Sequence, residues 1–394
     1  MKYKKIIAMM TLVFMCTFMV GCWDKVEIDK RLFISMIGID PGKDIDKEEE
    51  MEKIKQNEPF SKTDMEKLNI TYGFPDISEL GPQKGAQATE KHISVSGYSM
   101  ENSVGKATEK SSRALTFGHL KLLLLNEGLV EHEKTFKEVI DYIERQPAIN
   151  RMIYLSLTNI PSSQIVEFKP NVEKDVEAYI EGIMNNNKNN NTSFPTTLDE
   201  FLENLSTTGN SVLPVVSIDK KDKELKISEL ALIKDYKIVG SLSINEGNSI
   251  ELVKGNFKKG TRSIVREGSP IDYSIEGFER KIKLNDDSGK LSFDINLSLE
   301  GQIKNYNSDK NIFSKKAIDE IEEDFNQSIK QEIDQVIKVT QSKYDCDVVG
   351  LGSYLYKYHP KTWKKVKDDW DNIYKKVKVN INVDTNIRRV GSTK

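Results

Sequence analysis

Residues that could support catalysis or hold a metal ion are few and widely spaced in this sequence. The four histidines are His92, His119, His132 and His359. No two of them have the spacing that places two imidazoles on one face of a helix, so a zinc site is not supported. A Gly-x-Ser-x-Gly nucleophile elbow is also absent from the sequence. The sequence therefore indicates a protein that is not an enzyme and that needs no metal and no cofactor.

Two short stretches have some features of ligand sites but lack the decisive residues. Residues 255–261 have the glycine spacing of a phosphate-binding loop, but no lysine follows the second glycine. Residues 44–48 resemble the start of a calcium loop, but the central glycine and the closing glutamate are missing. We therefore interpret both stretches as structural.

Cys22 is the residue for which the sequence predicts a specific chemical modification. Residues 2–5 include three lysines, and residues 6–20 carry no charge. A basic start followed by about 15 apolar residues is typical of a secretory signal, and it is shorter than the roughly 20 residues that a membrane-spanning helix needs. Gly21 and Cys22 stand at the cleavage position and resemble a bacterial lipobox, in which the cysteine thiol is lipidated. We expect a lipoprotein signal peptide at residues 1–21; the alternative is an uncleaved N-terminal anchor with a free thiol.

The charge balance argues against nucleic-acid binding. The 394 residues include 58 basic and 61 acidic side chains, a net charge of -3. Loss of the leader removes three lysines and leaves a net charge of -6, which favours a lipid tether over adsorption to an anionic membrane. Three cysteines are too few for a disulfide framework, and Cys346 is expected to be a buried thiol.

Residues 22–205 are predicted to form an N-terminal α/β domain. The expected strands are residues 32–39, 68–74, 92–97, 120–125 and 152–157, and the expected helices are residues 100–113, 136–145, 172–184 and 197–205. Strand, helix and strand in succession favour a mixed sheet with a parallel pair. Two stretches interrupt this order: a charged insertion near 43–67 and an asparagine-rich stretch, 185–191, which we expect to be a loop.

Residues 206–394 are predicted to form a C-terminal α+β domain, with a further division near residue 270. Short β-branched runs predict strands at residues 212–218, 229–234, 237–244, 250–253, 263–267 and 271–275. Asn285 to Gly289 predicts a hairpin turn, and the arm that follows it alternates apolar and polar residues, as in a sheet with one solvated face. Helices are expected at residues 315–342 and 362–374, and a strand at residues 377–383. The whole chain is therefore predicted to be a multi-domain α+β protein.

The three tryptophans are the candidates for a partner or membrane surface. Trp363 and Trp370 share one face of the expected helix 362–374, and lysines lie on the other faces. Two interpretations remain open: the rings pack in the C-terminal core, or they contact a partner or a membrane surface. Trp23 is next to Cys22, where a lipid would hold it at the bilayer interface.

Several stretches, in the same order along the chain, resemble the Ger(x)C family of spore-forming bacteria. They are Gly21-Cys22-Trp23-Asp24 with Gly38-Ile39-Asp40, then residues 113–121, residues 231–242, and finally Asp347–Gly352 with Tyr358-His359-Pro360, Trp363, Trp370 and Arg388–Gly391. The last group is the most specific. The resemblance therefore covers nearly the whole chain after the leader.

The resemblance implies a role in spore germination. Members of the family are the lipoprotein C subunits of nutrient germinant receptors. They are anchored on the outer face of the spore inner membrane, beside membrane-embedded A-type and B-type subunits. The resemblance implies no enzymatic activity, no cofactor and no nucleic-acid partner.

Two other classes of protein are weighed against this reading. A solute-binding lipoprotein would deliver a small molecule to a transporter, but such proteins usually have two similar α/β lobes, and the C-terminal half here has an antiparallel pattern. A cell-wall hydrolase would need a nucleophile or a metal set that the sequence lacks. The leading hypothesis is therefore a lipid-anchored interaction subunit.

Overall fold

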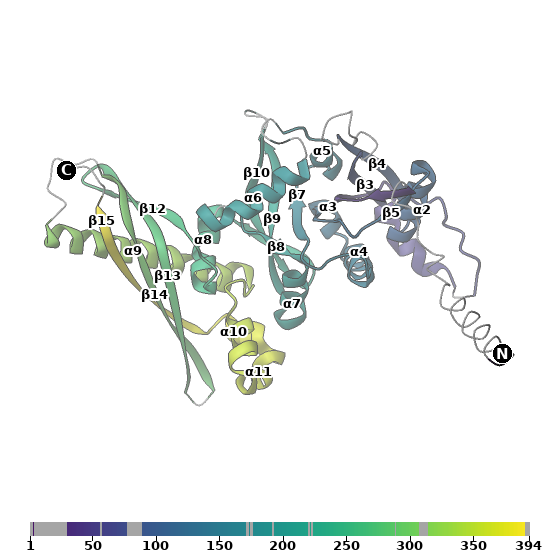
Figure 1. The fold of residues 1–394 in the computed structure, drawn as a ribbon. Helices are drawn as coiled ribbons and strands as arrows, with labels where there is room; N and C mark the ends of the chain where they lie inside the picture. The colour runs from purple at the N-terminus through teal and green to yellow at the C-terminus, as the bar shows by residue number, and fades with distance from the viewer. Residues whose placement is uncertain are drawn as a thin grey trace.

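The computed structural model describes residues 3, 30–55, 57–76, 89–170, 173, 176–190, 193–219, 221, 224–287, 289–306 and 314–390. The molecule is elongated, with a nine-stranded sheet in one half and a four-stranded sheet in the other (Figure 1). Helices and strands are mixed in both halves. The prediction of a multi-domain α+β protein is confirmed.

The nine-stranded sheet has the order β11-β10-β9-β7-β6-β2-β3-β4, with β8 paired to β7. Its strands are β2 (Met36–Pro41), β3 (Leu68–Pro75), β4 (Glu90–Gly97), β6 (Leu122–Asn126), β7 (Tyr154–Thr158), β8 (Thr196–Thr197), β9 (Asn210–Asp219), β10 (Glu224–Lys234) and β11 (Lys237–Leu242). The central strands β2, β6, β7 and β9 run parallel, and antiparallel strands flank them. The predicted mixed sheet is thus confirmed. Strands β1 (Arg31–Phe33) and β5 (Ala114–Thr116) form a separate parallel pair.

Helices cover both faces of this sheet. One face packs against α2 (Met100–Ser111), α3 (Glu127–Val130), α4 (Glu133–Arg145) and α7 (Leu198–Thr208), and the other packs against α5 (Ser162–Val166) and α6 (Val176–Asn190). Successive residues of β6 alternate between the two cores: Leu123 lies in the first and Leu124 in the second. The run of leucines at residues 122–125 is therefore explained by burial on both faces.

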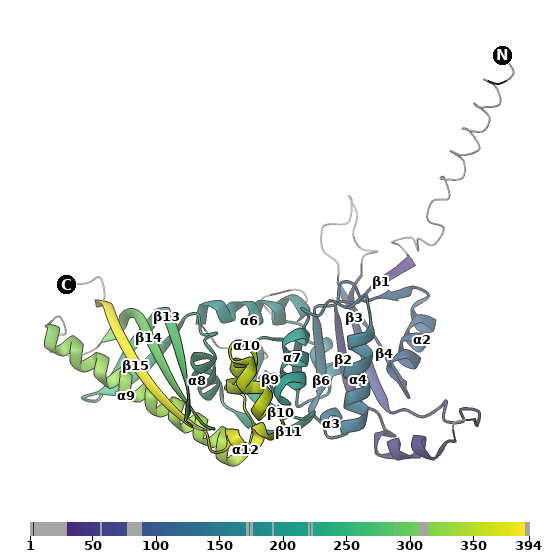
Figure 2. The same cartoon turned by 90° about the horizontal axis from the view of Figure 1, so that it is seen from below.

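The four-stranded sheet has the order β12-β13-β14-β15. Its strands are β12 (Gly260–Arg266), β13 (Ser269–Asp287), β14 (Lys290–Tyr306) and β15 (Lys378–Val390), and only the β14–β15 pair is parallel. The helix α9 (Lys315–Val339) crosses one face (Figure 2) and buries Phe325 and Ile329 against it. The predicted turn lies between β13 and β14, where Gly289 has φ 91° and donates its amide to Asp286.

The polypeptide after α9 forms a compact group of short helices near the centre of the molecule. These are the π-helix η4 (Thr340–Tyr344), α10 (Leu351–Tyr358), α11 (Pro360–Val366), the 3-10 helix η5 (Lys367–Asp369) and α12 (Trp370–Tyr374). The helix α8 (Ile244–Lys254) joins β11 to β12. Together with α7, these helices fill the junction of the two sheets (Figure 2).

The two halves share β10 at this junction. Leu230 and Leu232 pack in the C-terminal core, whereas Ala231 and Ile233 pack in the N-terminal core. The predicted division at residue 206 would separate β9, β10 and β11 from the sheet to which they are hydrogen-bonded. We propose that the division lies after Leu242, where the nine-stranded sheet ends.

Three local predictions are wrong. Of the stretch 185–191, expected to be a loop, residues 185–190 continue α6, whose buried Ile180 and Met184 hold it on the sheet; residue 191 lies outside the described residues. Residues 250–253, expected to be a strand, lie within α8, which begins with a capping box at Ser243. A short apolar run does not distinguish a strand from a buried helix. The expected helix 362–374 is interrupted by η5, so it is three short segments.

The charged insertion near 43–67 is attached to the N-terminal half. It contains the 3-10 helix η2 (Ile45–Lys53), and Glu48 accepts a hydrogen bond from Thr135 of α4 at 2.5 Å. Lys67 pairs with Glu138 of α4, also at 2.5 Å, with its own side chain almost fully buried. The insertion is therefore packed against α4 at both ends.

Candidate functional site

Cys22 and Trp23 lie outside the described residues, so the lipidation site remains a prediction from the sequence. Within the described part of the chain, no helix is both long and apolar enough to cross a membrane. The predicted contact of Trp23 with the bilayer interface also remains a prediction.

The two remaining tryptophans are core residues. The side chains of Trp363 and Trp370 are 7% and 3% exposed, and their ring centroids lie 5.7 Å apart in an edge-to-face arrangement. The break in the helix at η5 places them in contact while both remain inside the C-terminal core. The interpretation of Trp363 and Trp370 as a membrane or partner surface is therefore wrong, and the alternative interpretation as core is correct.

Trp370 also makes a polar contact that the sequence did not reveal. Its indole N–H donates to Oδ2 of the buried Asp347 at 2.9 Å. The same carboxylate accepts backbone N–H bonds from Gly350, Leu351 and Gly352, at 3.0, 3.1 and 2.7 Å. Burial raises the pKa of Asp347, and these donors act in the opposite direction. The carboxylate thus fixes the start of α10 to the core.

The two glycines explain the pattern Asp347–Gly352, with which the most specific part of the family resemblance begins. Gly350 adopts φ 81°, in the left-handed region. A Cβ on Gly352 would lie 2.7 Å from Nε1 of Trp370. This stretch is therefore a structural clamp whose parts come from residues 347–352 and from Trp370. In the sequence, this clamp was indicated by the residue spacing within 347–352.

A charged cluster joins the clamp to β10. The ammonium group of Lys234 lies 3.0 Å from Asp345 and 2.8 Å from Asp371, and Lys375 lies 2.8 Å from Asp345. Burial alone would lower the pKa of Lys234, but hydrogen bonds to the two carboxylates outweigh burial and raise it. Lys234 therefore connects the edge of the nine-stranded sheet to the C-terminal helices as a charged group.

Cys346 lies in the same region and is fully buried. Its Sγ lies 3.7 Å from the carbonyl oxygen of Ile233. Burial raises the pKa of the thiol, so it stays protonated and unreactive at neutral pH. The structure confirms the prediction of a buried thiol.

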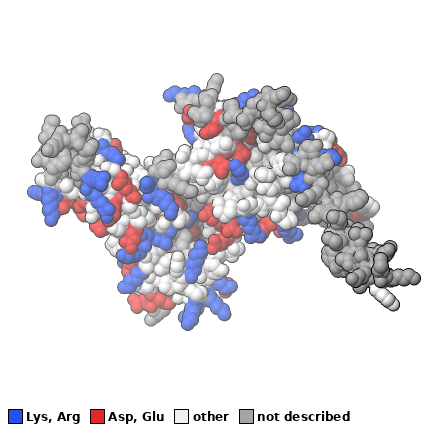
Figure 3. Space-filling model, viewed as in Figure 1, with Lys and Arg blue, Asp and Glu red and all other residues white. Residues whose placement is uncertain are grey.

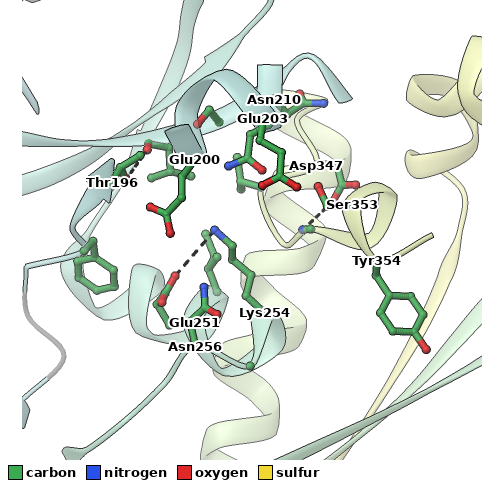
Figure 4. Close-up of a pocket in the computed structure, with 18 of the residues that line it drawn as sticks. Thr196, Glu200, Glu203, Asn210, Glu251, Lys254, Asn256, Asp347, Ser353 and Tyr354 are labelled. Carbon is green, nitrogen blue, oxygen red and sulfur yellow. Dashed lines mark hydrogen bonds and ion pairs between the residues drawn. The ribbon is translucent and has the colours of Figure 1, made fainter. Parts of the chain in front are cut away.

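A cavity of about 410 Å³ lies beside the clamp, between the two halves. Its walls come from α7, α8 and α10 and from the strands β9, β10 and β13. The labelled side chains in Figure 4 are Thr196, Glu200, Glu203, Asn210, Glu251, Lys254, Asn256, Asp347, Ser353 and Tyr354. The sequence gave no indication of this cavity, because its walls come from segments far apart along the chain.

Charged side chains of both signs line this junction cavity. Glu200 and Glu251 point toward each other from α7 and α8, and Lys254 lies near both (Figure 4), 3.9 Å from Glu251. Burial, together with the charge of Glu200, raises the pKa of Glu251, whereas Lys254 acts in the opposite direction. Glu203 lies at the mouth, 3.2 Å from Lys357 of α10.

The junction cavity contains polar groups but no recognisable catalytic set. Within the described residues, no three His, Cys, Asp or Glu side chains are grouped so that they could hold a metal ion. Asp347 is engaged by four N–H donors, so its carboxylate is a structural group and not a free base. The arrangement is suited to binding a small polar molecule, and it provides no activated nucleophile.

The fold is similar to that of a solved spore protein. The crystal structure of the GerBC protein matches with a TM-score of 0.58, covering 82% of this chain and 93% of that chain at 23% sequence identity. The chain therefore has a fold similar to that of GerBC.

Sequence comparisons identify the family. Residues 24–218 match the family described as "Spore germination protein N-terminal domain", and residues 228–391 match "Spore germination B3/GerAC like, C-terminal". Similar proteins include spore germination protein GerQC of Bacillus cereus, 27% identical over 78% of this chain and 85% of that protein. Spore germination protein B3 of Bacillus subtilis is 24% identical over 92% of this chain and 91% of that protein. The chain belongs to the Ger(x)C family, as its sequence motifs indicated.

Proposed function

We propose that this chain is a lipid-anchored, non-catalytic subunit of a spore germinant receptor. Its anchor is the lipidated Cys22, and its location is the outer face of the spore inner membrane. It acts in nutrient-triggered germination through contacts with membrane-embedded A-type and B-type subunits. It needs no cofactor and binds no nucleic acid.

The observation that carries the proposal is the order of the family matches. They begin at residue 24, directly after the predicted lipidation site, and continue to residue 391 with a short gap between 218 and 228. The relatives that match over most of their length are all spore germination proteins.

Substitution of the predicted lipidation site tests the proposal. We expect Cys22→Ala to move the protein from the membrane fraction of spores to the soluble fraction and to slow germination in response to nutrients. Cys16→Ala is the matched control, because Cys16 lies in the leader and its loss leaves Cys22 in place. A Cys22→Ala spore that germinates at the wild-type rate would contradict the proposal.

The junction cavity favours a second candidate, a lipoprotein that binds a small solute for a transporter. Its glutamates suit the ammonium group of a small zwitterionic ligand, and Lys254 and Arg280 suit its carboxylate. Calorimetric titration of the purified chain with a panel of amino acids, and of the Glu251→Gln variant, separates the two functions. Tight binding that is lost in the variant would favour the solute-binding function, and no binding would favour the receptor subunit.

A further inference from the structure

The helices α10 and α11 form a lobe that projects from the junction (Figure 1). Tyr356 and Tyr358 are 50% and 66% exposed on it, which is unusual for large side chains in this molecule. Lys361, Lys364 and Lys365 of α11 are also exposed. Figure 3 shows lysine and arginine side chains gathered at this lower end of the molecule. We call these five residues the basic lobe.

The basic lobe is held rigidly by its buried face. Leu355 and Trp363 pack in the C-terminal core, and Asp347 fixes the first turn of α10. The hydroxyl of Tyr354 donates to the carbonyl oxygen of Ile282 on β13 at 3.2 Å. The exposed tyrosines and lysines are therefore presented by helices with a fixed orientation, so binding would not require the backbone to become ordered.

The lysines of the basic lobe are exposed, and the exposed Asp368 and Asp369 follow Lys364 and Lys365 by four residues. Neighbouring lysines do have partners: Lys357 pairs with Glu203 at 3.2 Å, and Lys367 lies 3.7 Å from Asp368. In the part of the chain that the structure describes, Lys361, Lys364 and Lys365 make no ion pair. The lobe is thus a local concentration of positive charge on a chain whose net charge is negative.

We propose that the basic lobe contacts the anionic phospholipid headgroups of the membrane to which the chain is anchored, and so fixes the orientation of the body. The inference rests on the proposed anchoring. Exposed tyrosines beside lysines are typical of side chains at a bilayer interface, because the ring is amphipathic and the ammonium group pairs with phosphate. Three such lysines favour the docked state over the undocked state by roughly a hundredfold at an anionic surface.

Lysine labelling on vesicles tests the proposal with the full-length lipidated chain. The chain is reconstituted on vesicles of phosphatidylcholine alone, or with about a third of phosphatidylglycerol, and treated with an acetylating reagent. We expect Lys361, Lys364 and Lys365 to react about tenfold more slowly on the anionic vesicles. The reactivity of Lys315 and Lys316, which are exposed on α9, should be equal on both. In about 0.5 M NaCl, where the Debye length is roughly 4 Å, the protection should disappear.

Matched charge reversals complete the test. One triple variant carries Lys361→Glu, Lys364→Glu and Lys365→Glu. Its lobe should no longer be protected on anionic vesicles, and acetylation of Tyr356 and Tyr358 measures this protection. The control variant Lys315→Glu, Lys316→Glu, Lys330→Glu, on α9, has the same net charge and should keep it. Equal labelling on both kinds of vesicle would overturn the proposal.

Flotation of the same samples separates this proposal from the anchoring itself. A chain that floats with both kinds of vesicle but shows no protection is anchored without using the lobe. A chain that floats only with anionic vesicles binds them through the basic lobe and not through a lipid anchor. That result supports the proposed contact of the lobe and contradicts the proposed anchoring. A chain that floats with neither contradicts both.

Discussion

The two sheets of this protein bury their apolar side chains in different ways. The nine-stranded sheet is covered by helices on both faces, and its central strands are parallel. The four-stranded sheet has one face against α9, and its other face carries polar side chains such as Asp294, Asn296 and Asn382. Central strands of one region, such as β6 and β7, therefore bury nearly every residue, whereas β14 of the other region buries every second residue.

This difference is visible in the order of apolar and polar residues along each strand. In β6 consecutive leucines are buried, so the sequence shows an apolar run without alternation. In β14 the buried Ile295 is followed by the exposed Asn296, whose amide oxygen accepts a bond from Asn382 of β15. The comparison shows that the order of apolar and polar residues along a strand depends on whether helices cover one face or both faces of its sheet, and not on the strand itself. Substitutions of neighbouring residues test this directly.

The largest effect is expected in the nine-stranded sheet. Leu123→Ala and Leu124→Ala remove side chains from opposite faces of β6, and both are fully buried. We expect each to lower the free energy of unfolding by about 2–5 kcal/mol. Urea unfolding followed by circular dichroism measures the change. If either substitution had little effect, one face of the sheet would not be packed as described.

In β14 we expect the two neighbouring positions to differ. Ile295→Ala should lower the free energy of unfolding by about 2–5 kcal/mol, because it opens a cavity under α9. Asn296→Ala should change it by less than about 1 kcal/mol, because the side chain is exposed. The fluorescence of Trp363 and Trp370 reports this region. Equal effects at the two positions would contradict a sheet with one solvated face.

The junction clamp should give the next largest effect, because it joins the two regions. Asp347→Asn replaces one acceptor oxygen by an amide group that faces N–H donors, and it should cost about 1–3 kcal/mol. Trp370→Phe removes one donor and keeps an aromatic ring. The double variant should cost less than the sum of the two single variants, because they share one hydrogen bond. Additive costs would show that the two residues do not interact.

The smallest effect is expected at a surface ion pair of the N-terminal half. Glu133 of α4 lies 2.5 Å from Lys137 and 2.8 Å from Lys237 of β11, and these lysines lower its pKa to about 2. A lowered pKa in the folded state stabilises the protein above the ordinary pKa of a glutamate, and this stabilisation is lost as the pH falls toward 2. Glu133→Gln should therefore be slightly less stable than the wild type near neutral pH.

The difference in stability between the wild type and Glu133→Gln should disappear as the pH falls from about 5 to 2. It should also decrease in high salt, because the charged groups are exposed. Thermal unfolding at several pH values measures it. Glu109→Gln is the control, since Glu109 is exposed and makes no ion pair among the described residues. A constant difference at every pH would mean that the effect is not electrostatic.

The sequence predicted those parts of the fold in which local pattern and tertiary burial agree. The alternation in β14, the hairpin at Gly289 and the helices α7 and α9 are all confirmed. The run 250–253 failed because a few apolar residues fit either a strand or a buried helix, and the cap at Ser243 decided between them. The asparagine run failed because tertiary packing of α6 outweighs local propensity.

The candidate site was less predictable than the fold. The pattern Asp347–Gly352 was recognised, but its partner Trp370 lies 23 residues away, and nothing in the spacing joins them. Glu200, Glu251 and Lys357 meet at the junction cavity from three helices that are distant in the sequence. The spacing of Trp363 and Trp370 predicted that the two rings lie on the same side, and the rings are in contact. Periodicity alone does not tell whether such a face is buried or exposed.

The position of β15 has a consequence for how the protein is made. This strand, Lys378–Val390, pairs in parallel with β14, and paired residues such as Asp294 and Asn380 are 86 positions apart. The four-stranded sheet and the packing of α9 on β15 are therefore incomplete until almost the whole chain has been synthesised. Closing so long a loop is slow compared with forming a hairpin. Under the proposed export across a membrane, the four-stranded sheet is completed only when its last strand arrives, which favours a chain that remains competent for translocation.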